Sequence, residues 1–214
     1  KTVEKGNLNP LLYEKFWTVK TPNEFSPYWI ENGLENTLIH FENNGYPFAS
    51  IKLDSVSIKQ DSITTKLLIE KGLQTKIDSI LISGNTKLNP EYLYKHLSLK
   101  PGDLYNEAQL KSIPLKIDEL SFTTLKAPPS VVFTEEGTKL SLELKKAQTS
   151  NFRGIVGIQP NSEGKTSITG EADLLLHNNF YRGERVGIKW KRVQTGSQNL
   201  DLLVQYPYLF NSPI

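Results

Sequence analysis

The sequence contains no cysteine, and none of its apolar runs approaches the 18 or so residues that a transmembrane helix requires. Without cysteine, neither a disulfide framework nor a thiolate metal site can form. The sequence also lacks an excess of charge of either sign, because its 25 basic and 23 acidic residues give a formal net charge of only +2. This balance argues against a nucleic-acid partner. The 214 residues suffice for one or two domains with a proper core.

Recognisable catalytic motifs are missing as well. His40, His96 and His177 lie far apart, and no pair has metal-binding spacing. The sequence has neither a Gly-x-Ser-x-Gly elbow nor a phosphate-binding loop. Glu171 and Asp173 share one face of an expected strand, so an acid/base pair is conceivable there, but a strand with one wet face explains both residues. We therefore expect a protein that is not an enzyme and that has no cofactor or metal.

What the sequence does contain is a meander of four amphipathic strands in residues 150–210. Apolar or small residues alternate with polar ones, which is typical of strands buried on one side. The apolar positions include Ile168, Leu174, Ile188, Trp190, Leu202 and Val204. Each segment spans about 9–11 residues, the length that a tilted strand needs to cross a bilayer. The apolar face could pack on a second sheet in a soluble sandwich, or it could face lipid around a barrel.

Two motifs in this meander favour lipid. The turn Asn178-Asn179-Phe180-Tyr181-Arg182-Gly183-Glu184 and the segment Tyr206-Pro207-Tyr208-Leu209-Phe210 follow each other at a fixed spacing. They resemble the "N-x-F-x-G-E"-like hairpin turn and the "PYLF"-like strand end of the BamA/TamA superfamily. The resemblance implies that residues 150–214 are the first four or so strands of an outer-membrane β-barrel. Because four strands cannot close a barrel, we expect the chain to be a fragment whose strands pair with another copy or aggregate.

Residues 1–74 read as a small α+β module with an irregular or incomplete start. Ser26-Pro27 and Gly45 predict a helix over about residues 27–44. Two strands follow, at 48–59 and 62–70, joined at Gln60-Asp61. The apolar residues of the first strand change face midway, which predicts a bulge near Asp54-Ser55.

Residues 75–149 repeat this plan in a complete form. A strand at 76–83 ends at Gly84-Asn85, and Asn89-Pro90 begins a short helix. A second helix, from about Asn106 to Leu120, contains Pro114, which should kink or split it. A hairpin with strands at 130–134 and 139–145 turns at Glu136-Gly137.

This β-α-α-β-β order resembles a POTRA domain, a three-stranded sheet with two helices. The motifs that carry the resemblance are "I-x-I-S-G-N-T" at residues 80–86 and "L-x-L-K-P-G-D-L-Y" at 97–105. Gly45-Tyr46 and Phe48-Ala49-Ser50 resemble the "G-Y-x-x-A" corner of the same family. The expected fold class is therefore α+β: two POTRA-like modules, 1–74 and 75–149, followed by an antiparallel β-meander at 150–214.

The resemblance implies a factor that assembles, inserts or translocates outer-membrane proteins. It would lie in the bacterial outer membrane with its POTRA part in the periplasm. Implied partners are unfolded outer-membrane protein clients, outer-membrane lipid and possible accessory assembly subunits. In the family, client strands pair with the second strand of each POTRA domain, here represented by Ile51, Leu53, Val56, Ile58, Val131, Val132 and Phe133. Alternatively, these edges are solvated or covered by the neighbouring module.

The first barrel strand is the other candidate site, since in the family it lines a seam for client strands. Its residues here are Phe152, Gly154, Val156 and Ile158. Gly154 and Gly157 would loosen local packing, or they are ordinary barrel glycines. The alternative function is a soluble periplasmic or surface scaffold or adhesion protein, with the meander in a β-sandwich.

Overall fold

The computed structural model describes residues 2–4, 17, 27–59, 62–160, 164–194, 196–209 and 212–213. The chain forms two compact units whose segments interleave along the sequence. The first comprises Lys1–Ser79, Pro101–Ser112 and Phe133–Lys139, and the second Ile80–Lys100, Ile113–Val132 and Leu140–Ile214. The division into 1–74, 75–149 and 150–214 stays a prediction. Ser26 and the Gln60-Asp61 turn lie outside the described residues.

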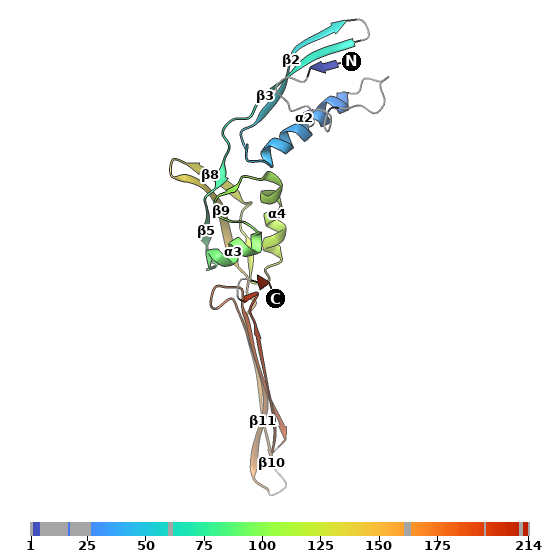
Figure 1. Cartoon of the computed structure of the whole chain (residues 1–214). Helices are drawn as coiled ribbons and strands as arrows, with labels where there is room; N and C mark the ends of the chain where they lie inside the picture. Colours follow the sequence, from blue (N-terminus) through green and yellow to red (C-terminus); the bar gives the residue numbers. More distant parts are fainter. Residues whose placement is uncertain are drawn as a thin grey trace. The chain divides into compact units, whose positions relative to one another are not determined.

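In the first unit, helix α2 (Pro27–Glu42) packs along a hairpin of β2 (Ser50–Lys59) and β3 (Ser62–Glu70). Figure 1 shows this helix running beside the two strands. Strand β1 (Thr2–Glu4) pairs in parallel with β3, so the sheet order is β1-β3-β2. Phe41, Leu67 and Ile69 form the core with Trp17, whose Nε1 donates to Thr37 Oγ1 at 2.9 Å.

A bulge in β2 confirms the predicted change of face. The register with β3 shifts between Asp54 and Ser57, and Ser55 has a φ of 55°. The Thr65 hydroxyl donates to the Asp54 carbonyl at 2.9 Å and so stabilises the irregular backbone. Beyond the bulge, Val56 and Ile58 are 56% and 72% exposed.

Helix α2 ends against the beginning of α4 (Glu107–Asp118), within the first unit. Gly45 takes the predicted left-handed conformation, with a φ of 95°, and its carbonyl accepts from Thr75 N at 2.7 Å. Asn106 caps α4 by accepting from Gln109 N, and Asn43 Oδ1 accepts from Ala108 N at 2.8 Å. A short pair, β4 (Lys76–Ile77) and β6 (Asp103–Leu104), completes this junction.

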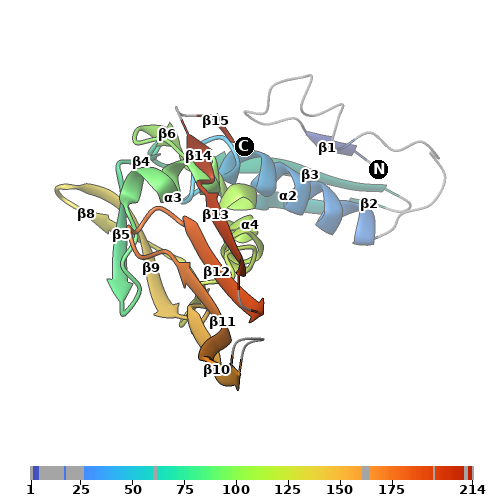
Figure 2. The same ribbon diagram turned by 90° about the horizontal axis from the view of Figure 1, so that it is seen from below.

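The second unit contains most of the predicted module 75–149. The strands of this module are β5 (Ser79–Gly84), β7 (Thr123–Leu125), β8 (Ser130–Thr134) and β9 (Gly137–Lys146). Their order is β5-β9-β7, and β8 also pairs with β9. Helix α3 (Pro90–Leu97) begins where Asn89-Pro90 predicted, and the Asn89 side chain caps it by accepting from Glu91 N at 2.8 Å. In both views α3 and α4 lie on the same side of β5 and β9 (Figures 1 and 2). The fully buried apolar side chains of this unit include Leu93, Leu97, Ile113, Ile117, Leu140, Leu142 and Leu144.

Four long strands follow as the predicted antiparallel meander. They are β10 (Asn151–Pro160), β11 (Thr166–His177), β12 (Arg185–Gln194) and β13 (Ser197–Gln205), in the order β10-β11-β12-β13 (Figure 2). Two short strands, β14 (Tyr208–Leu209) and β15 (Ser212–Pro213), pair with each other at the end of the described chain. The register places Phe152, Leu174, Ile188 and Leu202 side by side across all four strands.

The predicted fold class, α+β modules followed by an antiparallel meander, is confirmed. Pro114 does not split α4, which runs through it from residue 107 to 118. No helix within the described ranges has both the length and the apolar character required to traverse a membrane.

Candidate functional site

Each strand singled out from the sequence lies at an edge of its sheet, within the part of the chain that the structure describes. Strand β2 is the outer strand of β1-β3-β2, and β10 is the outer strand of the meander. Strand β8 pairs with β9 and lies off the main path of its sheet. An edge strand leaves backbone N–H and C=O groups free to pair with an added strand.

The four residues proposed on β2 do not form one surface. Ile51 and Leu53 pack against the core of the first unit, whereas Val56 and Ile58 are exposed beyond the bulge. An added strand would therefore meet apolar side chains mainly along the outer half of β2.

On β8, Val131 is half-buried, and Val132 and Phe133 are 41% and 43% exposed. The Phe133 ring contacts the Phe48 ring, with centroids 4.7 Å apart. Phe48 and Phe133 belong to the same compact unit, so this contact lies within it.

On β10, Phe152, Val156 and Ile158 share one face and are 69%, 77% and 73% exposed. Gly154 lies on the same face, where a side chain would approach the Phe152 ring at 3.3 Å. Gly157 points to the polar face, where a Cβ would come within 2.9 Å of Thr169 Oγ1. A side chain at position 157 would therefore require the Thr169 side chain to shift.

The turn between β11 and β12, used above only as a family motif, is held together by its own side chains. Glu184 is 2% exposed, and its carboxylate accepts from Phe180 N at 2.5 Å and from Arg182 N at 3.1 Å. Asn178 Oδ1 accepts from Gly183 N at 3.0 Å. The acidic and amide side chains of the "N-x-F-x-G-E" motif therefore hold the turn from within.

This turn is docked on the segment that precedes and begins α3. Asn89 N donates to Tyr181 O at 2.8 Å, and Asn178 Nδ2 donates to Lys87 O at 3.1 Å. Gly183 has a φ of 72°, and an added Cβ would lie only 2.5 Å from the Tyr92 ring. Glycine is thus needed here both for its backbone conformation and for the close approach.

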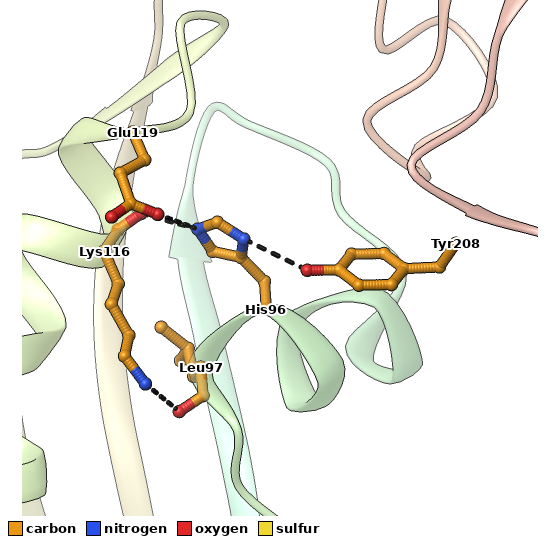
Figure 3. A network of polar contacts seen from close by, with 5 residues as sticks. All are labelled: His96, Leu97, Lys116, Glu119 and Tyr208. Carbon is orange, nitrogen blue, oxygen red and sulfur yellow. Dashed lines mark hydrogen bonds and ion pairs between the residues drawn. The ribbon is translucent and has the colours of Figure 1, made fainter. Parts of the chain in front are cut away.

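A second contact joins α3 to the chain just after β13 (Figure 3). His96 Nε2 lies 2.6 Å from the Lys116 carbonyl, which can only accept, so this nitrogen carries a proton. In the neutral ring Nδ1 then accepts from the Tyr208 hydroxyl, 3.4 Å away. Glu119 Oε2 is 3.9 Å from Nε2, and Lys116 Nζ donates to Leu97 O at 2.7 Å.

Tyr92 connects these two contacts. Its ring stacks on His96 with centroids 6.0 Å apart, and it meets Tyr208 edge-on at 5.6 Å. Burial raises the pKa of the Tyr92 phenol, and the neighbouring Tyr208 and Glu184 raise it further. The phenol is therefore neutral at physiological pH. We call the turn 178–184 with Tyr92, His96 and Tyr208 the docking cluster.

The two carboxylates considered above as an acid/base pair form ion pairs across the strands. Asp173 pairs with Arg153 at 2.9 Å, and Glu171 with Lys191 at 3.6 Å. The described residues contain no group of three or more His, Asp or Glu side chains arranged to hold a metal ion. Glu171 and Asp173 are thus accounted for as ion-pair partners.

Comparisons with known proteins show what this chain is similar to in sequence and in fold. Residues 75–140 match the POTRA family, described as a surface antigen variable number repeat. The outer membrane protein assembly factor BamA of Buchnera aphidicola subsp. Acyrthosiphon pisum (strain APS) is 22% identical over 107 residues, which is 49% of this chain and 17% of that protein. BamA from Haemophilus ducreyi lacking POTRA domains 1–3 gives a TM-score of 0.65 at 15% identity over 98% of this chain and 39% of its own. CdiB from Escherichia coli gives a TM-score of 0.47 at 14% identity over 96% and 38%.

The fold is that of a POTRA module joined to the strands that begin a BamA-type barrel. The resemblance to the BamA/TamA superfamily is thereby confirmed by a family match, a curated relative and a shared fold. The chain spans 17% of the length of the curated relative and 39% of the solved one.

Proposed function

We propose that this chain is part of an outer-membrane protein assembly, insertion or translocation factor. Its POTRA modules face the periplasm, and strands β10–β13 lie in the outer membrane. Its clients are unfolded outer-membrane proteins, with accessory assembly subunits as further partners. The similarity to assembly factor BamA in sequence and fold supports this role.

The observation that carries the proposal is that the three strands singled out from the sequence, β2, β8 and β10, each lie at an edge of their sheet. An extended client segment adds to such an edge through main-chain hydrogen bonds, which every sequence can make. Binding of this kind has low sequence specificity and suits a factor that handles many different clients.

The exposed apolar face of the meander supports a lipid-facing position. In a β-sandwich, the inner face of each sheet interdigitates with a second sheet about 10 Å away. Here Phe152, Leu202 and Val204 are 69%, 68% and 73% exposed, with no second sheet on them among the described residues. The soluble scaffold alternative requires a cover for this face, whereas a bilayer provides one.

Site-specific photo-crosslinking in cells tests client binding at an edge. A photo-reactive residue at Val156, on edge strand β10, should form adducts with newly exported outer-membrane proteins. The matched control is Ile188, on the same apolar face but in β12, which has neighbours on both sides. Client adducts at Val156 and not at Ile188 support strand addition at β10. Equal adducts at both positions, or none at Val156 in an active protein, would refute it.

A further inference from the structure

The polar face of the meander carries an ordered row of charges. The register aligns Arg153 with Asp173, Asp173 with Lys189, and Lys189 with Asp201. The row therefore crosses all four strands with alternating sign. The next row, Ile155, Glu171, Lys191 and Asn199, is charged only in its two central strands. Oppositely charged residues directly across two strands stabilise the pairing, and like charges destabilise it.

Arg153 ends this row at the free edge of β10. One guanidinium nitrogen of Arg153 donates to Asp173 Oδ2 at 2.9 Å, while the Arg153 side chain remains 77% exposed and that of Asp173 only 18%. A guanidinium has five N–H donors in a planar fork, so Arg153 can bind a second carboxylate on its other side. The residue facing Arg153 from an added strand would extend the alternation if it were acidic.

We infer that Arg153 selects the register of the client strand that pairs with β10 by binding an Asp or Glu directly opposite it. This inference rests on the proposed function, because it takes β10 as the site of strand addition. It also makes the partner more definite. The client segment is an amphipathic strand, with apolar residues facing Phe152, Val156 and Ile158 and one carboxylate facing Arg153 on the other face. A shift by one residue would turn that carboxylate to the apolar face, so the pair discriminates between registers.

Disulfide trapping on the full-length protein in lipid vesicles tests this pairing. The 214 residues contain no cysteine, so Ile155→Cys introduces a thiol that is unique in this segment. Three synthetic peptides alternate Val with Thr and carry a cysteine to face residue 155. They differ only in the residue that would face Arg153, which is Asp, Asn or Lys. Rates are normalised to the reaction of each thiol with glutathione, which removes the effect of nearby charge on thiolate formation.

We expect trapping rates in the order Asp, Asn, Lys, with roughly a two- to fivefold step for each change of charge. Arg153→Glu should reverse the order. Arg185→Glu is the matched control: it makes the same charge change on the same face, but in β12, away from the edge, and should leave the order intact. High salt should reduce the differences.

The outcomes separate the two ideas. Equal trapping of all three peptides, or an order that Arg153→Glu does not reverse, overturns the role of Arg153 and leaves strand addition at β10 standing. If none of the peptides is trapped, strand addition at β10 fails, and the role of Arg153 fails with it.

Discussion

Replacement of Gly183 by alanine should release the turn 178–184 from Tyr92. Two costs combine at this position. Gly183 has a φ of 72°, in the left-handed region. A non-glycine residue in this region costs about 1–2 kcal/mol. The new methyl carbon would lie 2.5 Å from the Tyr92 ring, well inside the van der Waals contact distance. Overpacking of this kind costs typically 1–3 kcal/mol. We expect a total of about 2–5 kcal/mol.

Hydrogen exchange in the full-length protein measures this loss where it occurs. The amides of Phe180 and Asn89 donate to Glu184 and to the Tyr181 carbonyl, so both report on docking of the turn. Because about 1.4 kcal/mol corresponds to a factor of ten, exchange of the peptides that contain these amides should accelerate by roughly 30-fold or more.

Gly196→Ala separates the two costs. Gly196 has a φ of 86° in the turn between β12 and β13, and nothing lies within 4 Å of an added Cβ. It should show the backbone cost alone, about 1–2 kcal/mol, with no change at Asn89. If Gly183→Ala proves no worse than Gly196→Ala, or if Asn89 stays protected, the close approach to Tyr92 does not hold the turn.

Three further predictions concern the buried carboxylate, pH and lipid. Glu184→Ala should destabilise the docked turn by about 1–3 kcal/mol for each backbone N–H left without its acceptor, measured by the same exchange; Glu184→Gln, which keeps one acceptor oxygen, should cost less, and equal effects would argue against the two bonds. Burial, with the nearby Glu107, raises the pKa of Glu42 above its ordinary value of 4.5. The folded state therefore holds this proton more tightly than the unfolded state, and stability falls as the pH rises from 4.5 towards the folded pKa. Glu42→Gln should remove that decline in denaturant unfolding measured between pH 4 and 7, and a decline unchanged by the substitution would contradict it. Brominated lipids should quench the fluorescence component lost in Trp190→Phe, because Trp190 shares the apolar face with Leu200; no difference in quenching between the two proteins would place this face away from lipid.

The elements that sequence could predict are those set by near neighbours. The cap at Asn89, the left-handed Gly45 and the bulge after Asp54 each follow from residues within a few positions. The two faces of the meander follow from alternation alone. At Pro114 the split, one of the two predicted effects, does not occur. Ile113 and Ile117, on either side of the proline, are fully buried, and their packing offsets the loss of one helical hydrogen bond.

The docking cluster was not predictable from local pattern, because its partners are distant along the chain. Asn178 and Lys87 are separated by 91 residues, and Tyr208 and His96 by 112. The sequence did signal that the turn is special, since it matches the superfamily motif. A carboxylate beside Gly183 in a tight turn could also have been interpreted as an acceptor for backbone N–H groups. Neither signal identifies Tyr92 or His96 as the partner surface.

The long separation of these contacts has a consequence for the order of folding. Among the described residues, strands β10–β13 pair only with their sequence neighbours, so they can form hairpins early and at a small loop-closure cost. Docking of the turn on residues 87–92 closes a loop of about 90 residues and needs α3 already in place. During synthesis from the N- to the C-terminus, the POTRA module would fold first and act as the template on which the later strands settle. A chain that is slow to fold this module would thus leave its strands exposed for longer, at the stage when unpaired edges are most prone to misassembly.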